Sequence, residues 1–287
     1  MSKLLKILPL LTLAILSTGC GKDSVNTNLN QIIAGNSVIG KDDRRVSANN
    51  LPRSLSNRVG QLVSTIPLRN SISTSTCTGS LIADDYVITA AHCIMSLKIY
   101  IKTDTIFYPG QLTSESTPEG GFIVTQAYIL KEYFEEDLET VDPNTDIAIL
   151  KIKKNSRGES AGRLLGEFQM TADGPTKKTD EILTIGYPGD LIIGTQYFQK
   201  DCKVNNRFFN RSSIKFECDT YLGQSGGPLL RYNQNSHDYE VFGIVSSELP
   251  SINLGAKITN SRLEDFQTII NGGVPDKKWM KFTIKGK

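Results

Sequence analysis

The sequence predicts an all-β fold of antiparallel strands with one helix near the C-terminal end. From about residue 55 onward, short runs rich in β-branched and aromatic residues alternate with turn residues. No long amphipathic helix interrupts these runs, so antiparallel barrels or sandwiches are favoured over alternating strands and helices. The chain has 287 residues, of which 39% are hydrophobic, which is enough to bury a substantial core.

Residues 1–20 have the pattern of a secretory signal peptide. Lys3 and Lys6 precede an apolar run at 7–16, which is too short to span a bilayer as a stable helix. Small residues and Cys20 follow this run. The position of Cys20 resembles that of the acylated cysteine in bacterial lipoproteins, which implies anchoring to a membrane. The alternative is a simple cleaved signal with a spare cysteine.

Residues 21–37 are rich in Asn, Ser and Gly and are predicted to form a propeptide or a flexible tether. The main folded domain is then expected at 38–273, followed by a basic tail at 274–287. The net charge of +2 gives no reason to expect nucleic acid as a partner.

A hairpin is predicted where the runs at 78–83 and 86–90 meet at two aspartates. Further strands are expected at 146–152, 182–187, 228–232 and 241–247. The acid-rich segment 128–142 is interpreted as a solvated loop, because its spacing fits no standard calcium loop.

The predicted helix begins near Ser261, which forms a capping-box pattern with Glu264. Its apolar face consists of Leu263, Phe266, Ile269 and Ile270. Two glycines at 272–273 provide an end for the helix.

Four cysteines remain after Cys20, and an even number in an exported protein suggests two disulfides. Cys77 and Cys93 flank a strand-turn-strand segment, and Cys202 and Cys218 bracket one expected hairpin. We therefore predict the pairs Cys77–Cys93 and Cys202–Cys218, with crossed pairings as the alternative. No metal is expected at these cysteines, because no Cys-x-x-Cys pair or histidine cluster accompanies them.

Three motifs indicate nucleophilic catalysis. Ser225 lies in Gly-Gln-Ser-Gly-Gly-Pro, where a tight turn can expose its hydroxyl. A serine needs a base, and the base needs a partner that fixes its tautomer. Of the two histidines, His92 ends a strand, whereas His237 lies among polar residues expected in a surface loop. Asp146 precedes an apolar strand and is the expected partner of His92.

The N–H groups of Gly223 and Ser225 are expected to form the oxyanion hole. The chain order His, Asp, Ser and the lack of a strand-helix nucleophile elbow argue against an α/β-hydrolase esterase. Each motif alone also fits a purely structural role, and the joint occurrence in this order favours catalysis.

These motifs resemble the trypsin-like serine endopeptidases of the chymotrypsin fold, and more of the chain resembles their bacterial glutamyl endopeptidase branch. The matching segments are 38–44, 77–93, 186–190, 219–225 and 253–260. The resemblance runs from about 38 to 270. It implies two antiparallel six-stranded β-barrels with the triad in the cleft between them, and removal of a propeptide close to Ser37-Val38.

The resemblance also implies a substrate pocket, from which this sequence departs in two places. Gln224 replaces the aspartate that receives the new N-terminal amine in trypsin, so activation is expected to follow another route. Val245 stands where glutamyl endopeptidases usually carry a histidine. Asp219 matches the position of the acid that selects Lys or Arg in trypsin, Thr220 matches a carboxylate-binding threonine, and Lys257 offers a cation.

The predicted function is that of a serine endopeptidase, secreted or lipid-anchored outside the cytoplasm, that works through an acyl-enzyme without a cofactor. Cleavage after Lys or Arg, with Asp219 as counter-ion, is weakly favoured over cleavage after Glu. The expected partners are protein or peptide substrates, and the expected state is a monomer. An inactive homologue that acts as a binding lipoprotein is the rival hypothesis from another class.

Overall fold

The computed structural model describes residues 38–67, 72–96, 100–135, 142–175, 180–205, 213–249, 251–273, 275 and 277–284. The chain divides into two compact units, Met1–Ala34 and Gly35–Lys287. The first unit, and with it the predicted signal peptide and Cys20, lies outside the described residues. Within the described ranges, no helix combines the length and apolar character needed to cross a membrane.

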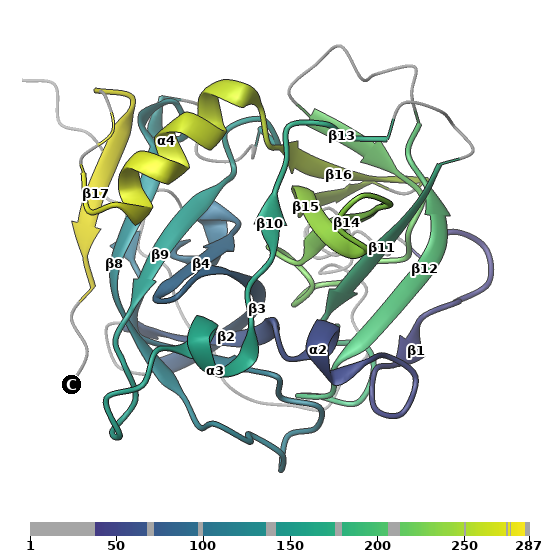
Figure 1. Cartoon of the computed structure of the whole chain (residues 1–287), viewed down its shortest axis with the longest axis horizontal. Coiled ribbons are helices and arrows are strands. Elements are labelled where there is room, and N and C mark those ends of the chain that lie inside the picture. The colour runs from purple at the N-terminus through teal and green to yellow at the C-terminus, as the bar shows by residue number, and fades with distance from the viewer. Residues whose placement is uncertain are drawn as a thin grey trace, which may run out of the picture. The chain divides into compact units, whose positions relative to one another are not determined.

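Six strands of the N-terminal half form a closed antiparallel barrel (Figure 1). They are β2 (Val59–Pro67), β3 (Ile72–Ala83), β4 (Tyr86–Thr89), β7 (Thr103–Pro109), β8 (Phe122–Leu130) and β9 (Ala148–Ile152). The pairing order is β8-β7-β2-β3-β4-β9, and the pairing of β8 with β9 closes the ring. The predicted hairpin is confirmed as β3–β4, where Ser80 lies opposite Ile88. Leu81, Val87 and Ile149 are fully buried inside this barrel.

A second sheet contains six longer strands, which pair antiparallel, and two peripheral ones, of which β10 pairs parallel. The six are β11 (Glu181–Gly186), β12 (Tyr197–Lys203), β13 (Ser213–Phe216), β14 (Pro228–Asn233), β15 (Asp238–Leu249) and β16 (Ile252–Lys257), in the order β12-β11-β14-β15-β16-β13. An isolated antiparallel bridge between Val204 and Phe216 connects the two ends of this order. Short β1 (Arg45–Val46) and β10 (Gln169–Met170) add to β12 and β15.

The remaining elements are short, except for one helix near the C-terminal end. They are α2 (Arg53–Ser56), η1 (Ala91–Cys93), β5 (Met95–Ser96), β6 (Tyr100–Ile101), η2 (Lys131–Phe134) and α3 (Ala161–Leu165). The predicted helix is confirmed as α4 (Asn260–Ile270). Its N-cap is Thr259, whose hydroxyl accepts the N–H of Arg262, so the predicted cap at Ser261 is displaced by two residues. Gly272, at φ +81°, follows the helix as predicted.

The segment predicted as a basic tail instead forms strand β17 (Trp279–Thr283), which pairs antiparallel with β8 on the first barrel. Trp279 is buried and its indole N–H donates to Asp265 at 2.9 Å. Lys281 within this strand is exposed and lies over the Tyr128 ring, while Trp279 packs against Phe266 of α4. The folded domain therefore extends beyond residue 273.

Both predicted disulfides are confirmed: Cys77–Cys93 ties to strand β3 of the barrel, and Cys202–Cys218 ties to strand β12 of the second sheet. Each closes a loop with a sequence separation of 16. Cys77 lies on β3 and Cys93 on η1, so the first disulfide ties the histidine-bearing segment to a barrel strand.

Removing either disulfide is expected to lower the free energy of unfolding by about 3 kcal/mol, because a loop of this length is then left open in the unfolded chain. Chemical denaturation of the double variant Cys202→Ala/Cys218→Ala would measure the loss, with peptide mapping under non-reducing conditions to establish the native pairs. Crossed pairs, free thiols in the exported protein, or an unchanged free energy would contradict the expectation.

Candidate active site

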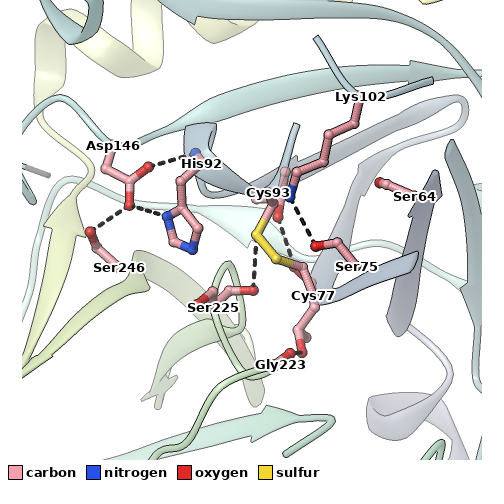
Figure 2. Close-up of a disulfide and its surroundings, with 12 residues drawn as sticks. Ser64, Ser75, Cys77, His92, Cys93, Lys102, Asp146, Gly223, Ser225 and Ser246 are labelled. Carbon is pink, nitrogen blue, oxygen red and sulfur yellow. Dashed lines mark hydrogen bonds and ion pairs between the residues drawn. A yellow bond between two sulfur atoms is a disulfide. The ribbon is translucent and has the colours of Figure 1, made fainter. Parts of the chain in front are cut away.

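His92 and Asp146 meet between the end of β4 and the start of β9 (Figure 2). His92 Nδ1 lies 2.8 Å from Asp146 Oδ2, and the His92 backbone N–H donates to Oδ1 at 2.9 Å. The loop that carries Asp146 is itself held in a turn, because the N–H groups of Thr145 and Asp146 both donate to the Asp142 carbonyl. The two predicted partners are therefore brought together from positions 54 residues apart.

Ser246 is a third member of this cluster, and sequence reasoning gave it no role. Its hydroxyl donates to Asp146 Oδ2 at 2.6 Å. Burial alone would raise the pKa of the fully buried Asp146 carboxyl, but the His92 charge and the hydrogen bonds from His92 and Ser246 outweigh burial and lower it. An ionised Asp146 holds the proton of His92 on Nδ1, which leaves Nε2 as an acceptor.

Ser225 lies on a tight turn that glycine makes possible. Its carbonyl accepts the N–H of Thr78 at 2.9 Å, and the Gly226 N–H donates to Val245 at 2.7 Å. Gly226 has φ +79°, and an added Cβ would lie 2.1 Å from Thr89 Oγ1. A larger residue would require Thr89 to move, so glycine at position 226 is explained by close packing between the two halves of the domain.

The peptide that precedes Ser225 by two positions is oriented by a backbone hydrogen bond. The Gly189 N–H donates to the Leu222 carbonyl at 2.7 Å. In a trans peptide the N–H points away from its carbonyl, so the Gly223 N–H is directed away from Gly189. Gly223 has φ +99°, and an added Cβ would lie 2.4 Å from the Tyr187 carbonyl. The Leu222–Gly223 peptide, which carries the predicted oxyanion donor, is therefore held in one orientation by the hydrogen bond from the Gly189 N–H.

A cavity of about 400 Å³ borders these groups. Its lining includes His92, Gly223 and Ser225, together with the disulfide residue Cys77 and Lys102. Figure 2 shows the Ser225 side chain near the edge of the His92 ring that faces away from Asp146. The structure thus gathers the predicted nucleophile, the predicted base and the predicted oxyanion donors at one opening.

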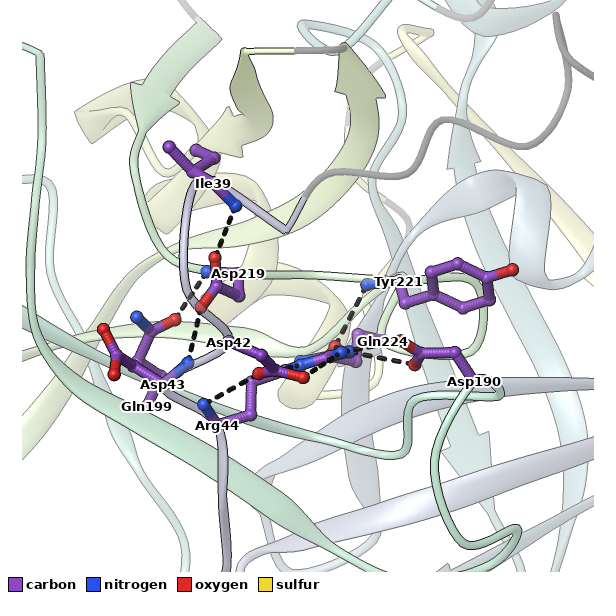
Figure 3. Close-up of polar contacts among 9 residues, drawn as sticks. All are labelled: Ile39, Asp42, Asp43, Arg44, Asp190, Gln199, Asp219, Tyr221 and Gln224. Carbon is purple, nitrogen blue, oxygen red and sulfur yellow. Dashed lines mark hydrogen bonds and ion pairs between the residues drawn. The ribbon is translucent and has the colours of Figure 1, made fainter.

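None of the four residues predicted to read the substrate lines this cavity. Asp219 is 1% exposed, and its carboxylate accepts the N–H of Ile39 at 2.7 Å and of Asp43 at 3.0 Å (Figure 3). The segment at the start of the described chain therefore packs against the residue predicted to be the Lys/Arg counter-ion. Each Asp219 oxygen can still accept one further hydrogen bond. A substrate cation that binds Asp219 would have to share the carboxylate with the backbone of residues 39 and 43.

The other three predicted pocket residues have different surroundings. Thr220 is fully buried, and its hydroxyl lacks a close hydrogen-bond partner in the described part of the chain, although it interacts with Glu248 at longer range. Val245 is buried between backbone bonds to Gly226 and Gly227. Lys257 is half-buried on β16 and interacts with other groups, so it is not a free cation.

Arg44 is a buried cation that sequence reasoning did not single out. Its guanidinium binds Asp190 through two hydrogen bonds of 2.6 and 2.9 Å and also binds Asp42 (Figure 3). It donates to Gln224 Oε1 at 3.3 Å, and the same oxygen accepts the Tyr221 N–H at 3.0 Å. The Arg44 side chain is 1% exposed. The guanidinium of Arg44 thus holds Gln224, the residue next to Ser225. In trypsin an aspartate at this position binds the new N-terminal amine instead.

Replacing Arg44 with methionine is expected to lower kcat at least about tenfold, with a smaller effect on KM, because the turn from Tyr221 to Ser225 loses its anchor. Arg44→Lys should recover only part of the loss, since lysine lacks the planar fork. Steady-state kinetics would measure both variants beside Arg163→Met, which removes an exposed arginine paired with Asp84. Wild-type kcat in Arg44→Met would contradict this role.

Among the described residues, one group has the proximity of metal ligands: Cys77, His92 and Cys93. The two sulfurs are bonded to each other, so neither is available as a thiolate ligand. His92 is also engaged by Asp146 through Nδ1. This donor set does not fit a metal centre.

Comparison with known proteins identifies the family. The Trypsin family model matches residues 60–259, which is more than half of the chain. An "Extracellular metalloprotease" of Bacillus subtilis is 28% identical over 86% of this chain and 74% of its own length. "Glutamyl endopeptidase" of Staphylococcus aureus is 24% identical over 55% of this chain and 43% of its own length.

Solved structures agree on the fold. One of a Glu endopeptidase in complex with MPD has a TM-score of 0.62 at 24% identity, covering 82% of this chain and 99% of that one. The protease Anisep from Arthrobacter nicotinovorans has a TM-score of 0.61 at 16% identity, covering 75% and 96%. The chain belongs to the trypsin family, and it is a serine endopeptidase of the chymotrypsin fold that resembles the glutamyl endopeptidases.

Proposed function

We propose that this endopeptidase acts outside the cytoplasm with Ser225 as nucleophile, His92 as general base and Asp146 as its orienting partner. The observation that most supports the proposal is the double contact of Asp146 with His92 beside the cavity that Ser225 borders. The two disulfides support an oxidising location, because such bonds persist outside the reducing cytosol.

The geometry supports a two-step hydrolysis. His92 Nε2 takes the proton of Ser225 Oγ as this oxygen attacks the substrate carbonyl. The N–H groups of Gly223 and Ser225 stabilise the negative oxygen, and each donor lowers the activation barrier by about 3–4 kcal/mol. His92 then gives its proton to the leaving amine, which departs and leaves an ester on Ser225. Water, activated by the same histidine, hydrolyses the ester.

The name of the Bacillus relative raises the alternative of metal-dependent hydrolysis. The cysteines next to His92 are bonded to each other, and this favours the serine mechanism. Purified protein should lose activity on treatment with phenylmethylsulfonyl fluoride and keep it in EDTA. The reverse pattern would refute the serine assignment.

Cleavage after Lys or Arg remains our first proposal for specificity, with Asp219 as the counter-ion. Glu248 adds a second acidic group near the site, and burial raises its pKa to about 7 against the opposing charge of His92. Val245 supplies no charge of its own. A buried substrate carboxylate would face these acids, which is unfavourable unless a cation compensates.

Cleavage after Glu is the second proposal, and one observation favours it. The buried Thr220 hydroxyl, which interacts with the Glu248 carboxyl, would donate to a substrate carboxylate in its place. Relatives of this chain bear the name glutamyl endopeptidase. Mass-spectrometric profiling of cleavage sites in a peptide library decides between the two: Lys or Arg at the cleaved position supports the first, and Glu supports the second.

Maturation is proposed to occur at Ser37-Val38. The backbone N–H groups of Ile39 and Asp43 donate to the Asp219 carboxylate. A new amine at Val38 would therefore lie next to Ile39, whose position this hydrogen bond holds. N-terminal sequencing of the active exported protein is expected to begin at Val38, and such cleavage would release the enzyme from any lipid on Cys20. Active protein that begins at an acylated Cys20 would show that processing is not required.

A further inference from the structure

Lys102 is a buried lysine in the cavity next to the nucleophile. It lies between β6 and β7, and its backbone N–H donates to the Ile94 carbonyl at 2.7 Å. The residue is 6% exposed, yet it is among the residues that line the same cavity as His92 and Ser225. Figure 2 shows its ammonium group close to the Cys77–Cys93 disulfide.

The ammonium group is only partly satisfied. A lysine carries three N–H donors, and Nζ of Lys102 donates to one hydroxyl, Ser75 Oγ, at 2.9 Å. No carboxylate lies within ion-pair distance in the described ranges. The acid whose charge influences the pKa of Lys102 is Asp146, and the oxygens of Asp146 are already engaged by His92 and Ser246. Burial lowers the pKa of Lys102 to about 8, so most of it still carries a charge at pH 7.

The position of the cavity indicates which part of a substrate would meet this charge. The acyl-side pocket predicted from Asp219, Thr220 and Val245 does not border it. The cavity lies instead on the side of Ser225 where the disulfide is found (Figure 2). A peptide extends in opposite directions from the attacked carbonyl, so the chain that leaves with the amine would lie on this side.

We propose that Lys102 is a specificity-determining residue that binds a substrate carboxylate on the leaving-group side of the scissile bond. The carboxylate comes either from an Asp or Glu side chain in the first two residues after that bond, or from the C-terminus of a substrate that ends there. In the free enzyme Ser75 Oγ holds the ammonium in place, and a bound carboxylate supplies the missing counter-charge. The inference rests on the serine mechanism proposed above.

The test compares matched substrates. A set of fluorogenic peptides keeps the acyl side constant and carries Glu or Gln at the first or second position after the scissile bond. A parallel pair ends at the second position with a free carboxylate or an amide. The measured quantity is the ratio of kcat/KM for the acidic peptide to that for its neutral partner, which does not depend on how much enzyme is folded.

Wild type is expected to prefer the carboxylate about tenfold in at least one pair, and Lys102→Met should bring that ratio to about one. Ser75→Asp, which places a carboxylate against the ammonium without removing it, should also reduce the preference. Lys154→Met, an exposed lysine, is the matched control and should keep the wild-type ratio. The pair that responds identifies the source of the carboxylate.

A wild-type ratio near one in every pair, or a ratio that Lys102→Met leaves unchanged, would overturn the inference while peptide cleavage continued. If the proposed serine mechanism is wrong, the result is different: no peptide is cleaved, and an active-site serine reagent does not label the protein. If Lys102→Met does not fold, the ratio for Ser75→Asp decides alone.

Discussion

Replacing Ser225 with alanine is expected to abolish peptide hydrolysis and to leave the fold unchanged. The substitution removes only the hydroxyl group, and the hydrogen bond from the Thr78 N–H to the carbonyl of residue 225 stays in place. Loss of the nucleophile from such a triad lowers kcat by about 10⁶ and leaves only the residual effect of oxyanion and substrate binding. Steady-state kinetics on a fluorogenic peptide and circular dichroism would measure the two properties.

The matched control is Ser236→Ala, which removes an exposed hydroxyl from the turn between β14 and β15. It should retain wild-type kcat, as should His237→Ala, because His237 is exposed and lies in the same turn. Turnover near the wild-type level in Ser225→Ala would show that another residue performs the attack.

Replacing Asp146 with asparagine is expected to lower kcat by about 10⁴ at neutral pH. Asparagine can donate to His92 Nδ1, which moves the proton to Nε2 and leaves the histidine unable to act as the base. Asp238→Asn is the control, since it alters an exposed carboxylate bound to Arg58. Wild-type kcat in Asp146→Asn would contradict the assigned partnership.

The same substitution predicts a change in acid stability. The pKa of Asp146 is lowered on folding, so this carboxyl contributes stability above its ordinary pKa and loses it as the pH falls through the folded value. Wild type should therefore lose more free energy of unfolding between neutral and acidic pH than Asp146→Asn. An equal loss in both proteins would mean that the carboxyl is not stabilised by its contacts.

The residues proposed as catalytic could be singled out from the sequence because each lies in a local motif. The glycines around Ser225 and the strand that ends before His92 are visible within a few residues of sequence. The helix α4 was predictable for the same reason, since its apolar positions repeat at helical spacing. Its exact start was not, because Thr259 and Ser261 both offer a hydroxyl and tertiary contacts decide between them.

Arg44 and Lys102 were not predictable, because their partners are distant in the sequence. Arg44 binds Asp190 across 146 residues and Gln224 across 180. Lys102 looks like an ordinary polar residue between two short strands, and only the fold places it beside His92. No local signal distinguishes such buried cations from the many exposed lysines and arginines of the chain.

Asp219 illustrates a different limit. Its position six residues before Ser225 suggested a pocket residue, but the fold also places the segment at 38–43 against it. The spacing along the chain led us to expect the Asp219 carboxylate near the predicted nucleophile. It did not reveal that backbone N–H groups from the start of the domain also bind this carboxylate.

Labelling with a fluorophosphonate reagent, followed by peptide mapping, tests the central claim most directly. The reagent modifies a serine only when a base activates it and an oxyanion site receives the phosphonyl oxygen. The predicted result is a single adduct on Ser225 in the wild type and none in His92→Ala. An unlabelled protein, or an adduct on a different serine, would contradict the assignment of Ser225 and His92 as the catalytic pair.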